Sequence, residues 1–554
     1  MSDPAASVPD PHSAEPIRVV AVFVRDLAGR ILTVRKRGTD AFMQPGGKPE
    51  PGESPEQTGI RELAEELGAE LADLRLLGEW TAAAANEAGR LVQAVVFSAR
   101  LVRMSGVQAE IEELHWYDPA APDIPAERLA PLLRDVVLPW VGPPPPVTVV
   151  GIGADGHLAP GAAEAVADAE VLLGGRRHLS LVPERPDQVR RPWPSPLAEA
   201  LPSLLAEVAE RRVVVLASGD PLLSGIGTTL ASLVGNRLRL LPTVSSVALA
   251  RARTGWSAEE TEVVTVVGRD LDVLRRQLAP GRRLLVLSSD EHTPAAIAQL
   301  VREEGHGGTE VVVLGDLGSA AESRVAARAA EEAFWAEARL PRLNVVALEV
   351  VGPAGNSWST GLRDELFEHD GQLTKRDVRA GALSRLEPAP GLLLWDVGAG
   401  AGSVGIEWMR AHPTCRTIAV EADAERGARI DRNAARLGVP GLEVVVGRAP
   451  DALGPLPTPD AIFVGGGATA AGLIDRCAHR LRPGGRLVVH GVTVETEAEL
   501  LASYRRLGGE LTRISVERAE PLGTFTGFTP ARAVTQWAWT KPVPEPTTDG
   551  SVDR

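Results

Sequence analysis

Apolar and polar residues follow two different periods along the chain. In the N-terminal part, apolar runs of strand length surround a pattern of helical period over residues 55–67, and a second helix is expected before Trp140. The strand-like runs there cover residues 18–26, 30–37, 92–101 and 112–118. Farther along, strand-like and helix-like stretches alternate, which is typical of parallel or mostly parallel sheets flanked by helices. The expected fold class is therefore a mixed α+β domain followed by two α/β units.

Two breaks in this pattern define the expected domains. Four prolines at 143–146 end the first pattern, and the sequence Val351-Gly-Pro-Ala-Gly marks a softer break before the third. A chain of 554 residues has the length of about three or four domains. We expect these domains over residues 17–143, 146–353 and 354–541, with polar, disordered ends at 1–15 and 542–554.

Composition narrows the class of protein. Hydrophobic residues make up 44% and charged residues 24%, as in ordinary globular proteins, and the formal net charge is −15. Such an acidic chain is a poor candidate for coating nucleic acid or adhering to an anionic membrane. No stretch has the character of a signal peptide or membrane span, and Cys415 and Cys477 lack the spacing of a disulfide framework or zinc site. We therefore expect a cytoplasmic protein.

A dense acidic face marks the helical pattern of the first segment. Glu62, Glu65 and Glu66 stand at i, i+3 and i+4, which places three carboxylates on one side of a helix. A solvated, glutamate-rich helix would give the same pattern. Like charges at this spacing repel each other, so a bound cation would account for their density, and oxygen-only ligands suit Mg²⁺ or Mn²⁺. The stripe expected to face the core consists of Ile60, Leu63 and Leu67.

Residues 46–69 resemble the Nudix box throughout. Its positions are filled by Gly47, Glu53, Arg61, Glu62, Leu63, Glu65, Glu66 and Gly68, whereas Ala69 replaces a larger aliphatic residue. With the flanking strands, the resemblance covers about residues 17–143. It implies a Nudix fold and metal-assisted hydrolysis of a nucleoside diphosphate linked to another group. By the same resemblance, Glu62, Glu65 and Glu66 are metal ligands, Glu53 supports the metal site and Arg61 orients the carboxylates. Substrate identity would come from loops such as residues 81–87.

Glycine-rich turns follow the strands of the second segment. The strand VTVVGIG ends in Gly151 and Gly153, which allow the backbone to approach a ligand closely at the carboxyl end of a strand. A glycine-rich turn without any ligand would look the same. Four further stretches follow in order: VLLGGRRHL at 171–179, VVVLASGDPLLSGIG at 213–227, LPTVSSVALA at 241–250 and VVTVVGRD at 263–270.

This ordered set resembles the tetrapyrrole methyltransferases of cobalamin synthesis, and GGRRHL resembles their carbon-5 methylating members. The resemblance implies a two-lobed α/β fold with S-adenosylmethionine bound in the cleft between the lobes. The residues that would touch the methyl donor are Gly151, Gly153, Gly219, Asp220, Pro221, Ser245 and Ser246. Two stretches depart from the family pattern: the first loop is slightly short, and LPTVSS replaces a proline-glycine-aliphatic run.

The third segment carries another glycine loop. Residues 392–407 read LLLWDVGAGAGSVGIE, and the next strand presents Glu421, which is well placed to accept hydrogen bonds from ribose hydroxyls. A dinucleotide is the competing ligand. The aspartate before GxGxG, with DAIFVGGG at 460–467 and LRPGGRLVV at 481–489, resembles the doubly wound class I S-adenosylmethionine-dependent methyltransferases. That resemblance implies a donor site at Asp396, Gly398, Gly400, Gly402 and Glu421.

Upstream, GQLTKRDVRA at 371–380 resembles the beginning of carbon-15 methylating, decarboxylating subunits. A plain helix start capped by Thr374 is the alternative, but the distance to the glycine loop favours the resemblance and adds Thr374 to the donor site. Segments two and three together resemble precorrin C5,15-methyltransferases (decarboxylating). The implied reaction converts precorrin-6B and two S-adenosylmethionine into precorrin-8X, two S-adenosylhomocysteine and carbon dioxide. Arg376, Arg379 and Arg448 could bind the carboxylates of such a tetrapyrrole, although surface arginine is the safer default.

Two other functions fit parts of the pattern. The methyltransferase segments could act on RNA or another small molecule, but the acidic charge and the lack of a basic, aromatic-interleaved stretch count against RNA. The Nudix segment could be a catalytically idle module that regulates its neighbours, and its intact glutamate set counts against that.

Overall fold

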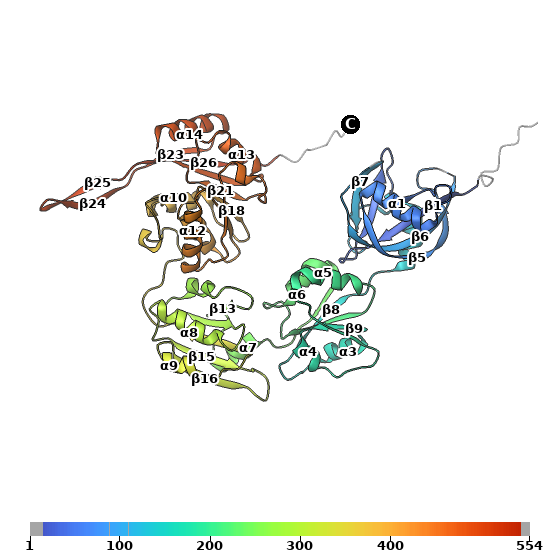
Figure 1. The fold of residues 1–554 in the computed structure, drawn as a ribbon, viewed down its shortest axis with the longest axis horizontal. Helices are drawn as coiled ribbons and strands as arrows, with labels where there is room; N and C mark the ends of the chain where they lie inside the picture. Colours follow the sequence, from blue (N-terminus) through green and yellow to red (C-terminus); the bar gives the residue numbers. More distant parts are fainter. Residues whose placement is uncertain (1–14, 88, 109, 545–554) are drawn as a thin grey trace, which may run out of the picture. The chain divides into compact units, whose positions relative to one another are not determined.

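The computed structural model describes residues 15–87, 89–108 and 110–544 (Figure 1). They form two compact units. One unit contains the described residues up to Leu249 together with Gly318–Ala320, and the other contains Ala250–Leu317 and the described residues from Ala321 on. The predicted disorder at the two ends falls almost wholly outside the described residues. Cys415 and Cys477 are buried and unpaired, and none of the described helices has the length and apolar character that a membrane span requires.

The first segment folds as the predicted α+β mixture of two small sheets and one main helix. A four-stranded sheet has the order β4-β1-β6-β5, with β1 and β6 parallel, and a three-stranded sheet has the order β3-β2-β7. The strands are β1 (Ile17–Val24), β2 (Ile31–Lys36), β3 (Phe42–Met43), β4 (Gly46–Gly47), β5 (Glu70–Ala83), β6 (Leu91–Arg103) and β7 (Ile111–Tyr117). The helices are α1 (Pro55–Leu67) and a π-helical turn, Leu132–Val137, that continues as α2 (Leu138–Val141).

The long strand β5 was not predicted from the sequence. Most of its side chains are exposed or half-buried, so it lacks the apolar run that announces a strand. Its pairing with β6 also shifts register three times, and Asp73 adopts a φ of 56° at the second irregular stretch. These bulges break the two-residue alternation on which the prediction depends. Part of the loop expected at residues 81–87 is therefore strand.

The first lobe of the second segment has a fully parallel sheet in the order β10-β9-β11-β8-β12. Its strands are β8 (Val147–Ile152), β9 (Val171–Gly174), β10 (Val189–Pro192), β11 (Val213–Ser218) and β12 (Leu238–Leu241). Its helices are α3 (Pro160–Asp168), α4 (Arg176–Ser180), α5 (Leu197–Glu207), α6 (Ile226–Val234) and α7 (Ser246–Thr254). The interior strand β8 is buried along its whole length, as expected for a parallel strand covered on both faces.

The second lobe differs from the prediction of a mostly parallel sheet. Its order is β13-β14-β17-β15-β16, and only β13 and β14 are parallel. The elements are β13 (Thr261–Thr265), β14 (Arg283–Leu287), α8 (Thr293–Glu303), β15 (Glu310–Gly315), β16 (Ser323–Arg328), α9 (Glu332–Glu337) and β17 (Asn344–Glu349). The connection from β15 to β16 is too short for a helical crossover, so those strands pair antiparallel.

The third segment is a doubly wound α/β domain, as predicted. Its seven-stranded sheet has the order β20-β19-β18-β21-β22-β26-β23, in which the first five strands are parallel. The strands are β18 (Leu393–Val397), β19 (Arg416–Glu421), β20 (Glu443–Val446), β21 (Ala461–Val464), β22 (Arg486–Gly491), β23 (Glu510–Ile514) and β26 (Val534–Thr540). The helices are α10 (Arg376–Leu386), α11 (Ser403–Ala411), α12 (Ala424–Arg436), α13 (Leu473–Arg480) and α14 (Val494–Leu507).

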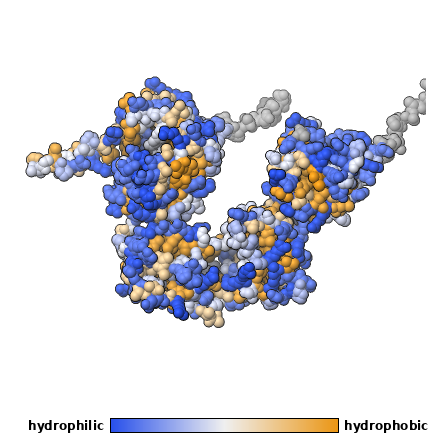
Figure 2. Space-filling model, viewed as in Figure 1, coloured by the Kyte–Doolittle hydropathy of each residue, from blue (hydrophilic) through white to orange (hydrophobic). Residues whose placement is uncertain are grey.

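A two-stranded hairpin projects from this third domain. It consists of β24 (Glu517–Leu522) and β25 (Phe525–Pro530), which pair only with each other (Figure 1). Leu522, Phe525 and Phe528 are exposed on it, and apolar colour marks its far end in Figure 2. In the main sheet, β19 and β20 lie on one side of β18 and β21 and β22 lie on the other, so the strand order reverses between β18 and β21. A crevice for a ligand is expected at the carboxyl ends of these two strands.

Candidate active sites

Helix α1 is fixed at both ends by local hydrogen bonds. Ser54 and Gln57 form a reciprocal capping box at its start, and Gly68 ends it in the left-handed conformation. Its buried side includes Leu63 and Leu67, as predicted, but Ile60 is 50% exposed, so the predicted core stripe is wrong at that position. Glu66 takes a place on the buried side instead. The acidic face is therefore not simply directed to solvent.

Glu66 lies inside the first segment with few partners. Its side chain is 2% exposed, it accepts a hydrogen bond from the backbone N–H of Gly46 at 3.1 Å, and Lys36 Nζ lies 3.2 Å from it. Burial disfavours the charged form and raises the pKa of Glu66 to about 7. Its Oε1 atom is the one that faces Lys36 Nζ, and it accepts no further hydrogen bond. A divalent cation at this atom would compete with the Lys36 ammonium.

Arg61 joins three of the predicted carboxylates. Its Nε donates to Glu53 at 2.7 Å, and its Nη1 donates to both Glu62 and Glu65 at 3.1 Å. The hydrogen bond from Arg61 to Glu53, with that from the Glu50 backbone, lowers the pKa of Glu53 to about 2. This carboxylate is therefore ionised throughout the neutral range. The geometry is that expected of a residue that orients the acidic set.

The donor chemistry of this site fits a hard divalent cation. The candidate ligands are carboxylate oxygens, among them the buried Oε1 of Glu66, which Lys36 Nζ approaches to 3.2 Å. Across the part of the chain that the structure describes, however, no three acidic, histidine or cysteine side chains already meet as a metal-binding group. Glu65 is 58% exposed and bound to Arg61. Side-chain movement would have to bring Glu65 to the metal.

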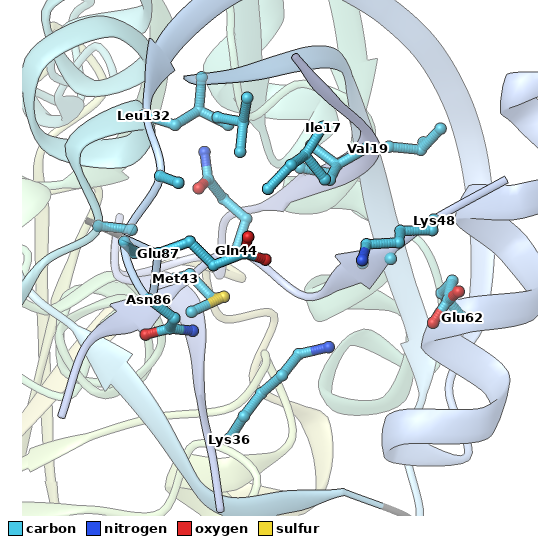
Figure 3. A pocket seen from close by; sticks show the side chains of 18 of the residues that line it. Ile17, Val19, Lys36, Met43, Gln44, Lys48, Glu62, Asn86, Glu87 and Leu132 are labelled. Atoms are coloured by element: carbon cyan, nitrogen blue, oxygen red, sulfur yellow. The ribbon is translucent and has the colours of Figure 1, made fainter. Parts of the chain in front are cut away.

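A cavity of about 510 Å³ opens beside this acidic set (Figure 3). Gly47 and Glu62 line it, and a side chain at Gly47 would collide with the Glu62 carboxylate, with a Cβ only 2.2 Å away. The segment of residues 81–87, which was expected to determine the substrate, also lines it through residues 83–87. Its charged lining also includes Lys36, Lys48, Arg61, Glu50 and Glu110, and Lys36 is ion-paired with Glu66 and Glu110. Two of the chain's four lysines thus face one cavity.

In the first lobe of the second segment, the three predicted loops meet at one edge of the sheet. Strands β11 and β12 flank β8 in parallel, so the turns that follow all three lie together. The contact is close: a Cβ at Gly151 would lie 2.0 Å from the carbonyl oxygen of Gly219 and 2.6 Å from the backbone nitrogen of Thr243. Asp220 and Ser245 each accept a backbone hydrogen bond within their own turns. This edge gathers the residues assigned by resemblance from this lobe.

His178 and Ser218 join that edge without having been singled out from the sequence. His178, within the GGRRHL stretch, lies 2.8 Å from the Ser218 hydroxyl, and its Nδ1 is buried without a partner. Burial, aided by the charge of Arg177, lowers the pKa of His178 to about 4, so the ring is neutral near pH 7. Both residues follow or end parallel strands, β9 and β11, and that position is the signal that could have found them.

A cavity of about 790 Å³ lies at the carboxyl edge of the third domain's sheet. Gly398, Gly400, Glu421 and Thr374 line it, together with the Gly465–Gly467 turn after β21. Glu421 is 6% exposed and accepts a hydrogen bond from the Gly400 N–H at 2.8 Å. This hydrogen bond holds the glycine loop against Glu421, the carboxylate expected to bind ribose hydroxyls.

Gly400 itself leaves little room for a side chain. Its φ is +61°, and a Cβ would lie 3.1 Å from the Gln372 carbonyl oxygen in the opposite wall. Asp396, in contrast, lies beneath the loop, where its carboxylate accepts the Gly405 N–H at 2.9 Å and burial raises its pKa to about 7. It braces the start of α11. Thr374 does not cap α10, because the residue at that position is Lys375 and it makes no side-chain cap bond.

His490 is a further residue that the sequence reasoning missed. It is the penultimate residue of the buried strand β22, lines the 790 Å³ cavity and packs edge-on against Phe463. The amide nitrogen of Gln536 donates to its Nε2 at 2.9 Å, and the amide oxygen accepts from Arg385 Nε at 3.0 Å. Burial lowers the pKa of His490 to about 4. The ring is therefore held neutral, with Nδ1 as its donor atom.

The three arginines suggested for substrate carboxylates have different environments. Arg448 lines the cavity and is exposed, and Arg376 is exposed on the first turn of α10. Arg379 is fully buried: its guanidinium contacts Glu407 at 2.6 Å and Asp364 at 3.2 Å. Glu407 in turn accepts two backbone N–H groups, from Gly361 and Leu362. The suggestion is wrong for Arg379, because its charge is already used to hold the 361–379 segment on α11.

Removal of this buried charge should be costly. Arg379→Met is expected to lower the free energy of unfolding by about 3–5 kcal/mol, because it leaves the buried Glu407 without its partner. The control Arg376→Met changes an exposed arginine on the same helix and should cost less than about 0.5 kcal/mol. Urea denaturation of both variants measures the difference. Equal midpoints for the two would contradict the structural role of Arg379.

Comparison with known proteins gives three family matches and close relatives. The matches are a NUDIX domain over residues 15–141, tetrapyrrole (corrin/porphyrin) methylases over residues 146–333 and a precorrin methyltransferase domain over residues 365–541. The precorrin-6Y C(5,15)-methyltransferase [decarboxylating] of Sinorhizobium sp is 46% identical over 418 residues, which are 73% of this chain and 97% of that protein. The protein of that name from Mycobacterium tuberculosis (strain CDC 1551 / Oshkosh) is 43% identical over 398 residues, which are 71% and 100% of the two chains.

A solved structure is also similar in sequence. The crystal structure of the C-terminal domain of precorrin-6Y C5,15-methyltransferase from Rhodobacter capsulatus shares 42% identity, covers 33% of this chain and 100% of its own, and superposes with a TM-score of 0.32.

Proposed function

Because the chain belongs to the precorrin-6Y C(5,15)-methyltransferase (decarboxylating) family, we propose that it adds methyl groups to carbons 5 and 15 of a precorrin and releases one acetate carboxyl as carbon dioxide. The support is the 46% identity to a relative of that name over 97% of the relative's length. S-adenosylmethionine is the methyl donor that this chemistry uses. The proposed reaction takes precorrin-6B to precorrin-8X.

We further propose that each methylation has its own donor site. Residues 146–353 would methylate carbon 5, and residues 354–541 would methylate carbon 15 and decarboxylate. The observation that carries the second site is the 790 Å³ cavity. There the Gly400 N–H donates to Glu421, which lies at the carboxyl end of β19. In the first lobe, the Gly151, Gly219 and Ser245 turns meet at an equivalent edge.

The residues around the larger cavity suit a polycarboxylate substrate. Arg448, Arg518 and Arg532 line it, and only Arg518 among them forms an ion pair with a described residue, a 3.4 Å contact with the exposed Asp377. Their guanidinium groups are thus largely free to bind peripheral carboxylates. Electron-rich tetrapyrrole carbons are themselves nucleophiles, so alignment with the donor methyl can supply much of the rate acceleration without an acid–base triad.

Donor stoichiometry tests this arrangement. Titration of the full chain with S-adenosylmethionine in a calorimeter should give two molecules bound per chain. A single site would contradict the division of labour.

We also propose that residues 17–143 hydrolyse a nucleoside diphosphate linked to another group. Glu62, Glu65 and Glu66 would hold Mg²⁺ or Mn²⁺, which when bound offsets phosphate charge and activates a water molecule. Glu53, through Arg61, would keep the acidic set in position. The observation that carries this proposal is the cavity that places Lys36, Lys48 and Glu62 around one space (Figure 3).

A further inference from the structure

The cavity of the NUDIX domain has two chemically different sides. Lys36, Lys48 and Glu62 lie together on one side in Figure 3. On the other side lie Ile17, Val19 and Leu132, which come from β1 and the π-helical turn. A diphosphate suits this charged side, where Lys48 and the ion-paired Lys36 supply cationic groups beside the acidic helix. The apolar side needs a different part of the ligand.

Gln44 stands among these apolar side chains. It lies between β3 and β4, is 4% exposed and lines the cavity. Its amide forms no hydrogen bond with any described residue through either atom, and of the two only Nε2 is fully buried. A buried amide without a partner normally costs free energy, so its retention in a ligand cavity needs an explanation.

The rest of the apolar side is lined by small side chains. Val92 from β6 and Ala83–Ala85 at the end of β5 add further apolar surface without any bulky side chain. Asn86 and Glu87 lie below Gln44 and add polar atoms at the rim (Figure 3). A pocket with apolar walls and a few inward polar groups is the usual environment of a small organic ligand, and a nucleobase is one such group.

We propose that Gln44 binds the edge of the nucleobase of the NUDIX substrate. This inference rests on the proposed hydrolase function and names the residue that would select the base of its substrate. A glutamine amide offers one donor and one acceptor side by side, which is the arrangement that pairs with a base edge. Rotation about its last side-chain torsion exchanges the two, since that torsion is broad and roughly two-fold. The base then stacks on the apolar walls while the diphosphate reaches Lys36 and Lys48.

A comparison of two ligands that differ only in the base tests this. The probes are ADP-ribose and diribose diphosphate, which is the same compound without adenine, with the other three nucleoside diphosphate riboses as alternatives to adenine. We expect kcat/KM for the best base-bearing probe to exceed that for the abasic probe by roughly tenfold or more, the value of a well-made buried hydrogen bond with its stacking.

The variant Gln44→Met keeps the length of the side chain and removes its hydrogen bonds. It should lower kcat/KM roughly tenfold for the base-bearing probe and leave the abasic probe unchanged. Its melting temperature should be unchanged or higher, because a buried amide without a partner has been removed. The control Gln93→Met makes the same change on an exposed position of β6 outside the cavity, and it should alter neither probe.

Two results would overturn the inference. One is an equal loss for both probes in Gln44→Met, which would indicate a structural role. The other is no change for either probe, which would leave Gln44 without a ligand. Equilibrium binding of the same probes without divalent metal repeats the comparison independently of turnover. If the protein binds the base-bearing probe more tightly than the abasic probe but hydrolyses neither, only the proposed hydrolase activity is contradicted. If it binds both probes equally, the role of Gln44 is contradicted.

Discussion

The double substitution Glu65→Gln, Glu66→Gln should lower metal-dependent diphosphate hydrolysis by about a thousandfold or more. Charge stabilisation by a bound metal is worth several kcal/mol, and each 1.36 kcal/mol is a factor of ten in rate. Neutral amides cannot hold a divalent cation as carboxylates do. Glutamine has nearly the same shape as glutamate, and at position 66 it can still accept the Gly46 N–H. Product release from a panel of nucleoside diphosphate derivatives, with Mg²⁺ and after its removal by a chelator, measures the effect.

The control for this variant is Glu56→Gln. Glu56 is an exposed acidic residue on the first turn of the same helix, so it changes the charge without touching the cavity. Methyl transfer should survive in the double variant. Retained hydrolysis would contradict the metal assignment, and loss of both activities in a folded protein would contradict the independence of the NUDIX domain.

Gly400→Val should abolish methyl-donor binding in the third domain. A branched side chain is strained at a φ of +61°, and its Cβ would lie 3.1 Å from the Gln372 carbonyl oxygen, inside the space that the ligand needs. Titration with S-adenosylmethionine should then give one site per chain instead of two, and no decarboxylated product should form.

Gly391→Val is the matched control. Gly391 has a similar φ of +82°, but no atom lies within 4 Å of an added Cβ, so the backbone strain is kept without the collision. We expect this variant to bind two molecules of donor. Two full sites in Gly400→Val would show that the donor binds elsewhere, and a single site in both variants would attribute the loss to strain alone.

The parts predicted best from the sequence are those fixed by local patterns. The spacing of Glu62, Glu65 and Glu66 and the glycine loop at Gly398–Gly402 identify their families, and the family matches confirm both. The parallel strands of the first lobe and of the third domain were also predicted, because a strand buried on both faces reads as an unbroken apolar run. In such cases one short stretch contains the whole signal.

Features that depend on distant packing could not be predicted in this way. Glu66, rather than Ile60, occupies the buried side of α1, because the side-chain-free Gly59 lets the helix approach Val22 of β1. Arg379 resembles a surface arginine in sequence, but its partners Asp364 and Glu407 come from other elements. Burial keeps the ring of His490 neutral, and its orientation is set by Gln536 and, through it, Arg385, which are far away along the chain. Helical periodicity and charge counts contain no information about such partners.

The central claim, that one step is divided between two domains, is tested most directly with the fragment of residues 354–541. Its hydrophobic clusters are made of its own residues, so it has an independent core. The fragment would be incubated with precorrin-6B and S-adenosylmethionine, and the product mass compared with that from the full chain. The account predicts a product that has gained one methyl group and lost one carbon dioxide, with the second methyl added only by the full chain. A folded fragment that gives a singly methylated product with its acetate intact would contradict the account.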